Sequence, residues 1–247
     1  MIFFYRILTF FLFPFLIVFT YIRRFNNKED KTRYKEKITI QETYFPKDKK
    51  VIWIHAASVG ETNSVIPLIQ NLIKKNNNIF ILLTSTTLSS SKLIKKKLDL
   101  NNFQHRFFLF DVQFLVKKFL NLWKPELAIF TDSEVWPNYL LEISKRKIPL
   151  VLLNGRITMK TFSRWKMIPK LSKKLFSLYN LCLSSSQESE KNLKFLGAKN
   201  VKFFGNLKFS VNTVQKKDNN LESFFKNLNV WCAASTHHGE EELILKT

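Results

Sequence analysis

The residues that could do chemistry collect in short stretches, each directly after an apolar run of strand length. In the first stretch, residues 51–54 have the β-branched and aromatic composition of a buried strand, and small residues including Ser58 and Gly60 follow. Glu61 is the only strong base in this turn and could take a proton from a substrate hydroxyl. The alternative is structural, because a first-turn carboxylate also complements the positive end of a helix dipole.

A second stretch, residues 131–138, reads TDSEVWPN and brings further acids to the end of a predicted strand. Trp136 and Pro137 suit a core anchor and a first-turn helix residue, which explains them structurally. Glu134 is not explained in this way and would share a sheet edge with Glu61. Two carboxylates at one edge perturb each other's pKa, as is common in catalytic sites.

Two further stretches offer positive charge after a predicted strand. Arg156 in LNGRIT could hold a phosphate or carboxylate with two hydrogen bonds, although an arginine in so basic a chain is also ordinary surface. Lys208 in FGNLKF follows a strand end and a glycine turn, again at the edge where the other motifs collect.

The last stretch, residues 233–242, reads AASTHHGEEE ahead of an apolar helix start. Ser235 and Thr236 suit an anion site there, and His237 could contribute to it. The alternative is an ordinary helix N-cap. The histidines and glutamates lack a defined ligand spacing, so we predict no metal site.

Alternating strands and helices must position these residues over 51–210. The spacing predicts βαβ units, and hence a parallel sheet with helices on both faces. Ligands bind such sheets at the carboxyl ends of the strands. The predicted strands are 51–54, 79–83, 105–110, 127–131, 150–153, 181–184 and 201–204.

Both ends of the chain depart from this pattern. Residues 1–22 are apolar apart from Arg6 and a few Thr and Tyr, and a basic flank begins at Arg23. This predicts an uncleaved membrane anchor over 1–24, spanning or interfacial, and a cytoplasmic basic linker over 25–50. Residues 211–229 read as a second linker, and a strand predicted at 230–234 would open a second domain. Because one strand and part of a helix cannot bury a core, we expect 230–247 to begin a largely missing domain.

The net charge of +21, from 40 Lys+Arg against 19 Asp+Glu, predicts an anionic partner. The sequence contains no zinc-finger spacing, RNP-like motif or arginine-rich tract, so nucleic acid is not expected. An anionic membrane surface or a phosphorylated substrate is the expected partner.

Taken together and in order, HAASVGE, SEVWPN, LNGRIT, GNLKF and AASTHHGEEE resemble the signature of the 3-deoxy-D-manno-octulosonic acid (Kdo) transferases of lipopolysaccharide assembly. The resemblance implies a GT-B glycosyltransferase, with two Rossmann-like domains facing a cleft. It further implies inverting, metal-independent transfer of Kdo from CMP-Kdo to the lipid A precursor, without a cofactor. The expected location is the cytoplasmic face of the bacterial inner membrane.

The resemblance also assigns roles to individual residues. Glu61 matches the general base, and Glu134 and Lys208 match positions that stabilise the transition state. Substrate-binding positions would be Ser58, Gly60, Arg156, Ser235, Thr236 and His237.

One departure from the family pattern is that the CMP-binding loops beyond the STH motif do not follow. We therefore expect this chain alone to bind donor poorly and to transfer little Kdo. Two other readings stay open from the residues themselves. One is a different GT-B enzyme with a nucleotide-sugar donor and another acceptor. The other is a non-catalytic domain that binds anionic lipid or nucleic acid through its basic surface.

Overall fold

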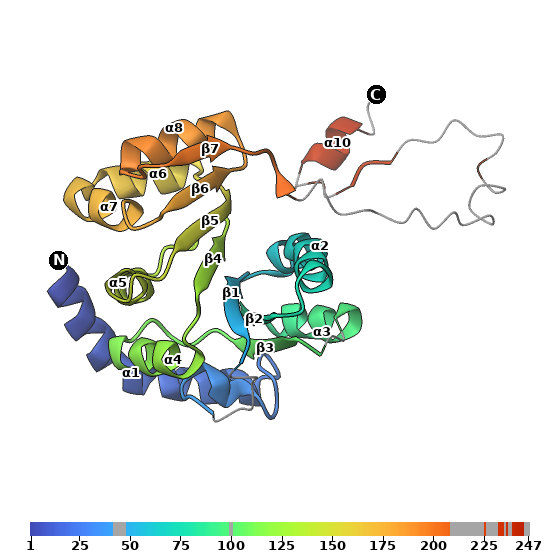
Figure 1. Ribbon diagram of the computed structural model, residues 1–247. Helices are drawn as coiled ribbons and strands as arrows, with labels where there is room; N and C mark the ends of the chain where they lie inside the picture. Colours follow the sequence, from blue (N-terminus) through green and yellow to red (C-terminus); the bar gives the residue numbers. More distant parts are fainter. Residues whose placement is uncertain are drawn as a thin grey trace. The chain divides into compact units, whose positions relative to one another are not determined.

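The computed structural model describes residues 1–41, 48–98, 101–207, 225, 232–234, 236 and 239–244. The chain divides into two compact units, Met1–Val211 and Asn212–Thr247. The first unit contains a parallel α/β sheet, and the second contains the helix α10 (Glu240–Ile244) (Figure 1). The two units are described separately below.

The sheet of the first unit has seven parallel strands in the order β3-β2-β1-β4-β5-β6-β7. The strand order reverses between β1 and β4, and this switch point is where α/β sheets bind ligands. The predicted Rossmann-like architecture is therefore confirmed for this unit. The strands are β1 (Lys50–His55), β2 (Ile79–Ser85), β3 (Phe103–Phe107), β4 (Leu127–Thr131), β5 (Leu150–Gly155), β6 (Leu181–Ser184) and β7 (Val201–Phe203).

Successive side chains of a strand point to opposite faces of the sheet. Both faces therefore carry apolar side chains, and helices cover both of them. Trp53 and Leu82 enter a core with α4, α5, α7 and α8, whereas Ile54 and Leu83 enter a second core with α2 and α3. Trp53 is fully buried among aromatic rings and donates its indole N–H to Thr84 Oγ1 at 2.9 Å. The helices are α2 (Val59–Lys75), α3 (Leu88–Lys97), α4 (Gln113–Trp123), α5 (Pro137–Lys145), α6 (Met159–Lys166), α7 (Pro169–Phe176) and α8 (Gln187–Leu196).

Three local predictions need correction. β3 occupies 103–107 and not 105–110, because after Phe107 the chain leaves the sheet and Phe108 stacks on His55. The sequence did not predict α6, a short and mostly polar helix that begins at the N-cap Thr158. Residues 232–234 are not in a strand, although one was predicted over 230–234, and a strand needs a hydrogen-bonded neighbour to persist.

The amino-terminal residues form α1 (Ile2–Phe25), a helix long and apolar enough to cross a membrane by length and composition. After α1, the short 3₁₀ helix η1 (Tyr34–Lys37) lies within the stretch predicted as a basic linker. It packs on β3, where Glu36 accepts hydrogen bonds from the Phe107 N–H at 2.9 Å and from Arg106 at 3.0 Å. Part of that stretch therefore belongs to the α/β unit.

Candidate active site

The turn between β1 and α2 fixes the carboxylate of Glu61. Ser58 is the N-cap of α2 and accepts the Glu61 N–H at 3.3 Å, while its hydroxyl donates to Glu61 Oε1 at 2.7 Å. The Ala57 N–H donates to Glu61 Oε2 at 3.0 Å. This is a variant of the capping box, in which the carboxylate accepts the N–H of the residue before the N-cap, so the structural role considered for Glu61 is real.

Glu61 also receives a hydrogen bond from outside its own turn. Thr131, the last residue of β4, lies 2.7 Å from Glu61 Oε2 through its Oγ1 and 3.0 Å from the His55 carbonyl. Glu61 is 7% exposed and Thr131 is buried, so this contact joins two strand ends inside the protein. An ionised carboxylate has about four acceptor sites. Three donors reach Glu61, which leaves capacity for one substrate hydroxyl.

Glu134 lies in the loop between β4 and α5 and is held by two aromatic side chains. Its Oε2 accepts the Trp136 indole N–H at 2.5 Å and lies 3.3 Å from His55 Nε2. Burial raises the pKa of Glu134, but the hydrogen bond and charge of His55 and the hydrogen bond of Trp136 outweigh it and hold this pKa below its ordinary value. Glu134 is therefore ionised at neutral pH, and its side chain keeps 18% exposure.

His55 connects the β1 end to Glu134, and its hydrogen bonds define its protonated nitrogen. The ring is fully buried and stacks on Phe108 with centroids 3.8 Å apart. Nε2 must carry a proton to donate to the Glu134 carboxylate. Nδ1 lies 3.0 Å from Thr84 Oγ1, whose hydroxyl can donate to it while accepting the Trp53 indole N–H. Nε2 therefore carries a proton in this arrangement, and Nδ1 faces both the Thr84 hydroxyl and, at 3.2 Å, the Thr84 carbonyl oxygen.

A side-chain hydrogen bond joins the ends of β4 and β5 beside His55 and Glu134. Asn154 donates from Nδ2 to Asp132 Oδ1 at 2.6 Å, and both residues have left-handed backbone, with φ of 57° and 52°. The Leu207 N–H donates to Asn154 Oδ1 at 2.9 Å. These bonds bring the GNLKF motif to the edge that carries LNGRIT and SEVWPN.

The structure brings together most of the predicted site residues that it describes in the first unit. Glu61, Glu134 and Arg156 follow β1, β4 and β5, which are neighbours in the sheet, and all three lie at its carboxyl edge. Ser58, Gly60 and Arg156 are exposed there and can meet a ligand.

The other predicted site residues fall in less fully described parts of the chain. Thr236 belongs to the second unit, where its hydroxyl donates to Glu241 Oε1 at 2.7 Å. Lys208, Ser235 and His237 lie outside the described residues.

Sequence reasoning missed His55, Thr131 and Asn154, which organise the carboxylates. Each is a polar residue at the end of an otherwise apolar strand, and that position is the signal that could have indicated them. Their partners depend on strand register and could not be found from spacing alone.

Comparisons with known proteins identify the family of this chain. A family described as 3-deoxy-D-manno-octulosonic-acid transferase (kdotransferase) matches residues 32–211. A 3-deoxy-D-manno-octulosonic acid transferase of Rickettsia bellii is 34% identical over 244 residues, 98% of this chain and 58% of the relative. A probable mitochondrial 3-deoxy-D-manno-octulosonic acid transferase of Arabidopsis thaliana is 32% identical over 98% of this chain and 56% of the relative.

Among solved structures, S. aureus MnaA with UDP has a TM-score of 0.50 and 12% identity, over 72% of this chain and 51% of that chain. This likeness concerns the fold, which is of the GT-B type. The family match covers most of the chain, and the chain therefore belongs to the Kdo transferase family of glycosyltransferases. It spans slightly more than half the length of the two curated relatives named above.

Proposed function

We propose that this chain carries the acceptor-side catalytic groups of a transferase that moves Kdo from CMP-Kdo to the lipid A precursor. The observation that carries the proposal is the placement of two fixed carboxylates, Glu61 and Glu134, at the switch-point edge of a sheet in a chain of the Kdo transferase family. The enzyme would work at the cytoplasmic face of the inner membrane, with the basic surface favouring anionic lipid and substrate.

In the proposed reaction, Glu61 accepts the proton of an acceptor-sugar hydroxyl. The hydroxyl oxygen forms a bond to the anomeric carbon of Kdo, and the bond from that carbon to the CMP phosphate oxygen breaks. The electron pair of the broken bond leaves with CMP. Attack from the face opposite the leaving group inverts the anomeric centre.

The fixed hydrogen bonds of Glu61 support its role as the base. Ser58, Ala57 and Thr131 hold the carboxylate in one orientation, so it need not reorganise when the hydroxyl arrives. General-base catalysis of this kind contributes typically about 10²–10⁴-fold to a rate.

Glu134 would stabilise the positive charge that develops on the Kdo ring as CMP leaves. A fixed, ionised carboxylate in a partly buried loop suits this task, because it is held by His55 and Trp136 before the reaction begins. Lys208 would stabilise the departing phosphate, and Arg156, Ser58 and Gly60 would contact substrate. Ser235, Thr236 and His237 would bind the donor.

A transfer assay tests the proposal. The chain is assayed as it is, and also as a chimera that adds the part of the R. bellii relative outside the match, with CMP-Kdo and a bisphosphorylated lipid A precursor. We expect mass spectrometry to detect the precursor with one or more added Kdo residues and release of CMP. A folded chimera that binds both substrates and forms no such product would contradict the proposal.

A further inference from the structure

The helix α1 has two different faces along its whole length. One face is partly or fully buried against the α/β unit, and its positions recur at helical spacing. The residues of this docked face include Tyr5, Thr9, Phe13, Leu16, Thr20 and Arg23. The opposite face is exposed and almost entirely apolar. We call it the aromatic face, and it includes Phe4, Phe11, Phe15, Val18, Ile22 and Phe25.

The docked face makes specific contacts near both ends of α1. Near the start, the Tyr5 hydroxyl donates to the buried Asp111 carboxylate at 2.7 Å, and Arg6 pairs with Glu142 at 3.3 Å. Near the end, Arg23 pairs at 2.6 Å with the buried Glu29 of the turn that follows the helix, and Glu29 in turn pairs at 2.5 Å with Lys37 of η1.

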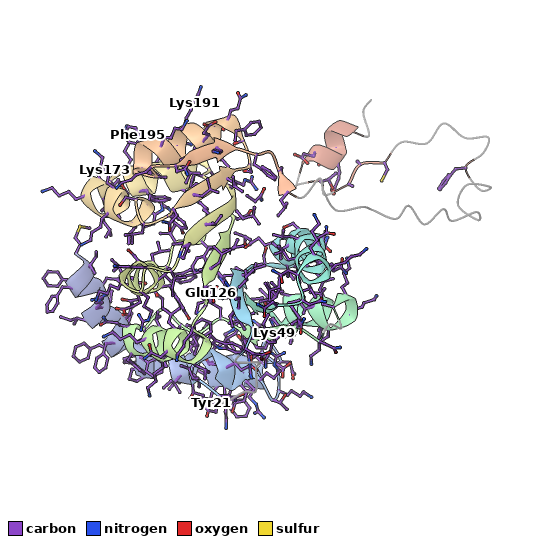
Figure 2. All side chains as sticks on the ribbon, in the orientation of Figure 1. Tyr21, Lys49, Glu126, Lys173, Lys191 and Phe195 are labelled. Carbon is purple, nitrogen blue, oxygen red and sulfur yellow. The ribbon has the colours of Figure 1, made fainter. Side chains whose placement is uncertain are left out.

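Aromatic contacts hold the helix between these points. Phe13 packs edge-on against Phe114 of α4, with ring centroids 5.2 Å apart. Tyr21, which Figure 2 labels on α1, packs on Tyr34 of η1 with ring centroids 5.3 Å apart. The helix is therefore docked along most of its length.

These contacts conflict with a membrane-spanning helix. The contacts of Tyr5 to Tyr21 with distant elements extend over about 24 Å of helix axis at 1.5 Å per residue, against about 30 Å for the hydrocarbon core. A spanning α1 would have to lose all of them, or carry Asp111 and Glu142 into hydrocarbon with the surrounding polar surface, which is strongly unfavourable.

We infer that α1 lies in the plane of one leaflet, with its aromatic face among the acyl chains and its docked face on the α/β unit. This inference rests on the membrane location in the proposed function and specifies its geometry. The aromatic face continues into a groove beside α4 with a volume of about 590 Å³, within the usual range of ligand pockets. Apolar side chains dominate its lining, as expected of a surface that lipid chains cover: Phe3, Ile7, Phe10, Phe11, Val112 and Phe114.

The charges beyond the helix favour an anionic leaflet as the partner. Arg24 lies in the last turn of α1, and Lys28, Lys31 and Lys35 follow it, all three exposed. Basic residues next to a membrane-embedded helix attract anionic head groups. The helix therefore has an apolar face for acyl chains and a basic end for head groups.

Protease accessibility distinguishes the two orientations. The full chain is expressed in bacteria with an epitope tag before Met1, and protease is added to inverted inner-membrane vesicles. An in-plane helix leaves the tag and the α/β unit on the same side, so both are digested together. A tag that stays protected in vesicles whose α/β unit is digested would overturn the inference.

Vesicle binding tests the aromatic face itself. The double variant Phe11→Asn, Phe15→Asn removes two side chains that are 68% and 71% exposed, so the fold should persist. We expect the affinity for vesicles of phosphatidylglycerol and phosphatidylethanolamine to fall about tenfold for each phenylalanine removed. This factor is the lower end of the affinity that full burial of a phenylalanine side chain provides.

The matched control is Phe195→Asn, which removes a 58% exposed phenylalanine from α8 and should leave binding unchanged (Figure 2). Equal loss in both variants, or no loss in the double variant, would contradict the inference. Neither readout depends on Kdo transfer, so a failure of the proposed reaction is distinguishable from a failure of the in-plane geometry.

Discussion

Asp111 should make the stability of the α/β unit depend on pH in a way that one substitution removes. This carboxylate is buried and accepts hydrogen bonds from the Tyr5 hydroxyl and from the first N–H groups of α5, those of Asn138 and Tyr139, at 2.7–3.1 Å. Burial nevertheless raises the pKa of Asp111 from 3.8 to about 6, because lost hydration outweighs these donors. A difference of about two pH units corresponds to roughly 3 kcal/mol.

The sign follows from proton linkage. Between pH 4 and 6 the folded protein holds a proton on Asp111 that the unfolded chain has lost, so stability from this group falls as the pH rises. Asp111→Asn cannot titrate. The free energy of unfolding of the wild type minus that of the variant should therefore fall by about 3 kcal/mol between pH 4 and pH 7.

Urea unfolding of the detergent-solubilised chain, followed by tryptophan fluorescence at several pH values, measures this difference. Asp48→Asn removes an exposed aspartate and serves as the control for a lost negative charge. If the difference between wild type and Asp111→Asn stays constant within about 1 kcal/mol over this range, the burial argument for Asp111 is refuted.

Two further predictions concern the packing and the site. Gly197→Ala should lower the unfolding free energy by about 2–4 kcal/mol in thermal unfolding, because φ is +112° and the new Cβ would lie 2.6 Å from Lys173 Cα. Gly205 has φ +94°, and an added Cβ there would meet no atom within 4 Å. Gly205→Ala should therefore lower the unfolding free energy by only about 1 kcal/mol. Equal losses in the Gly197 and Gly205 variants would refute the steric argument. Trp136→Phe removes a donor that lowers the pKa of Glu134, so the acidic limb of the pH–rate profile should move to higher pH. If the acidic limb stays at the same pH, the ionisation of Glu134 does not control the transfer rate.

The strand–turn–helix units and the parallel sheet were predictable because apolar periodicity and small-residue turns are local properties. The position of Glu61 at the start of α2 follows from the sequence of its own turn. A carboxylate at this position can cap the helix or act as a base, and the sequence alone does not decide between these roles. The structure shows the capping role and leaves acceptor capacity for the other, so the two roles are compatible.

The support of the site could not be predicted because it depends on contacts between distant residues. Asp111 holds the start of α5 from 27 residues away, and His55 meets Glu134 over 79 residues. Sequence periodicity carries no information about such pairs. The same limit applies to α1, whose composition fits a spanning helix although its docked face contacts distant elements along most of its length.

The most direct test of the central claim is the Kdo transfer rate of Glu61→Gln in the chimera that contains the R. bellii donor portion. Glutamine preserves the capping box, because one amide oxygen can accept from Ala57 and Thr131 while the amide nitrogen donates to Ser58. Ser186→Ala is the matched control, since it removes the N-cap hydroxyl of α8, costs about 1 kcal/mol of cap stability and leaves Glu61 with all its partners.

The account predicts a folded Glu61→Gln protein whose transfer rate falls by about 10²–10⁴-fold, while Ser186→Ala loses less than about tenfold. Transfer by Glu61→Gln at the wild-type rate would contradict it and leave Glu61 with its capping role alone.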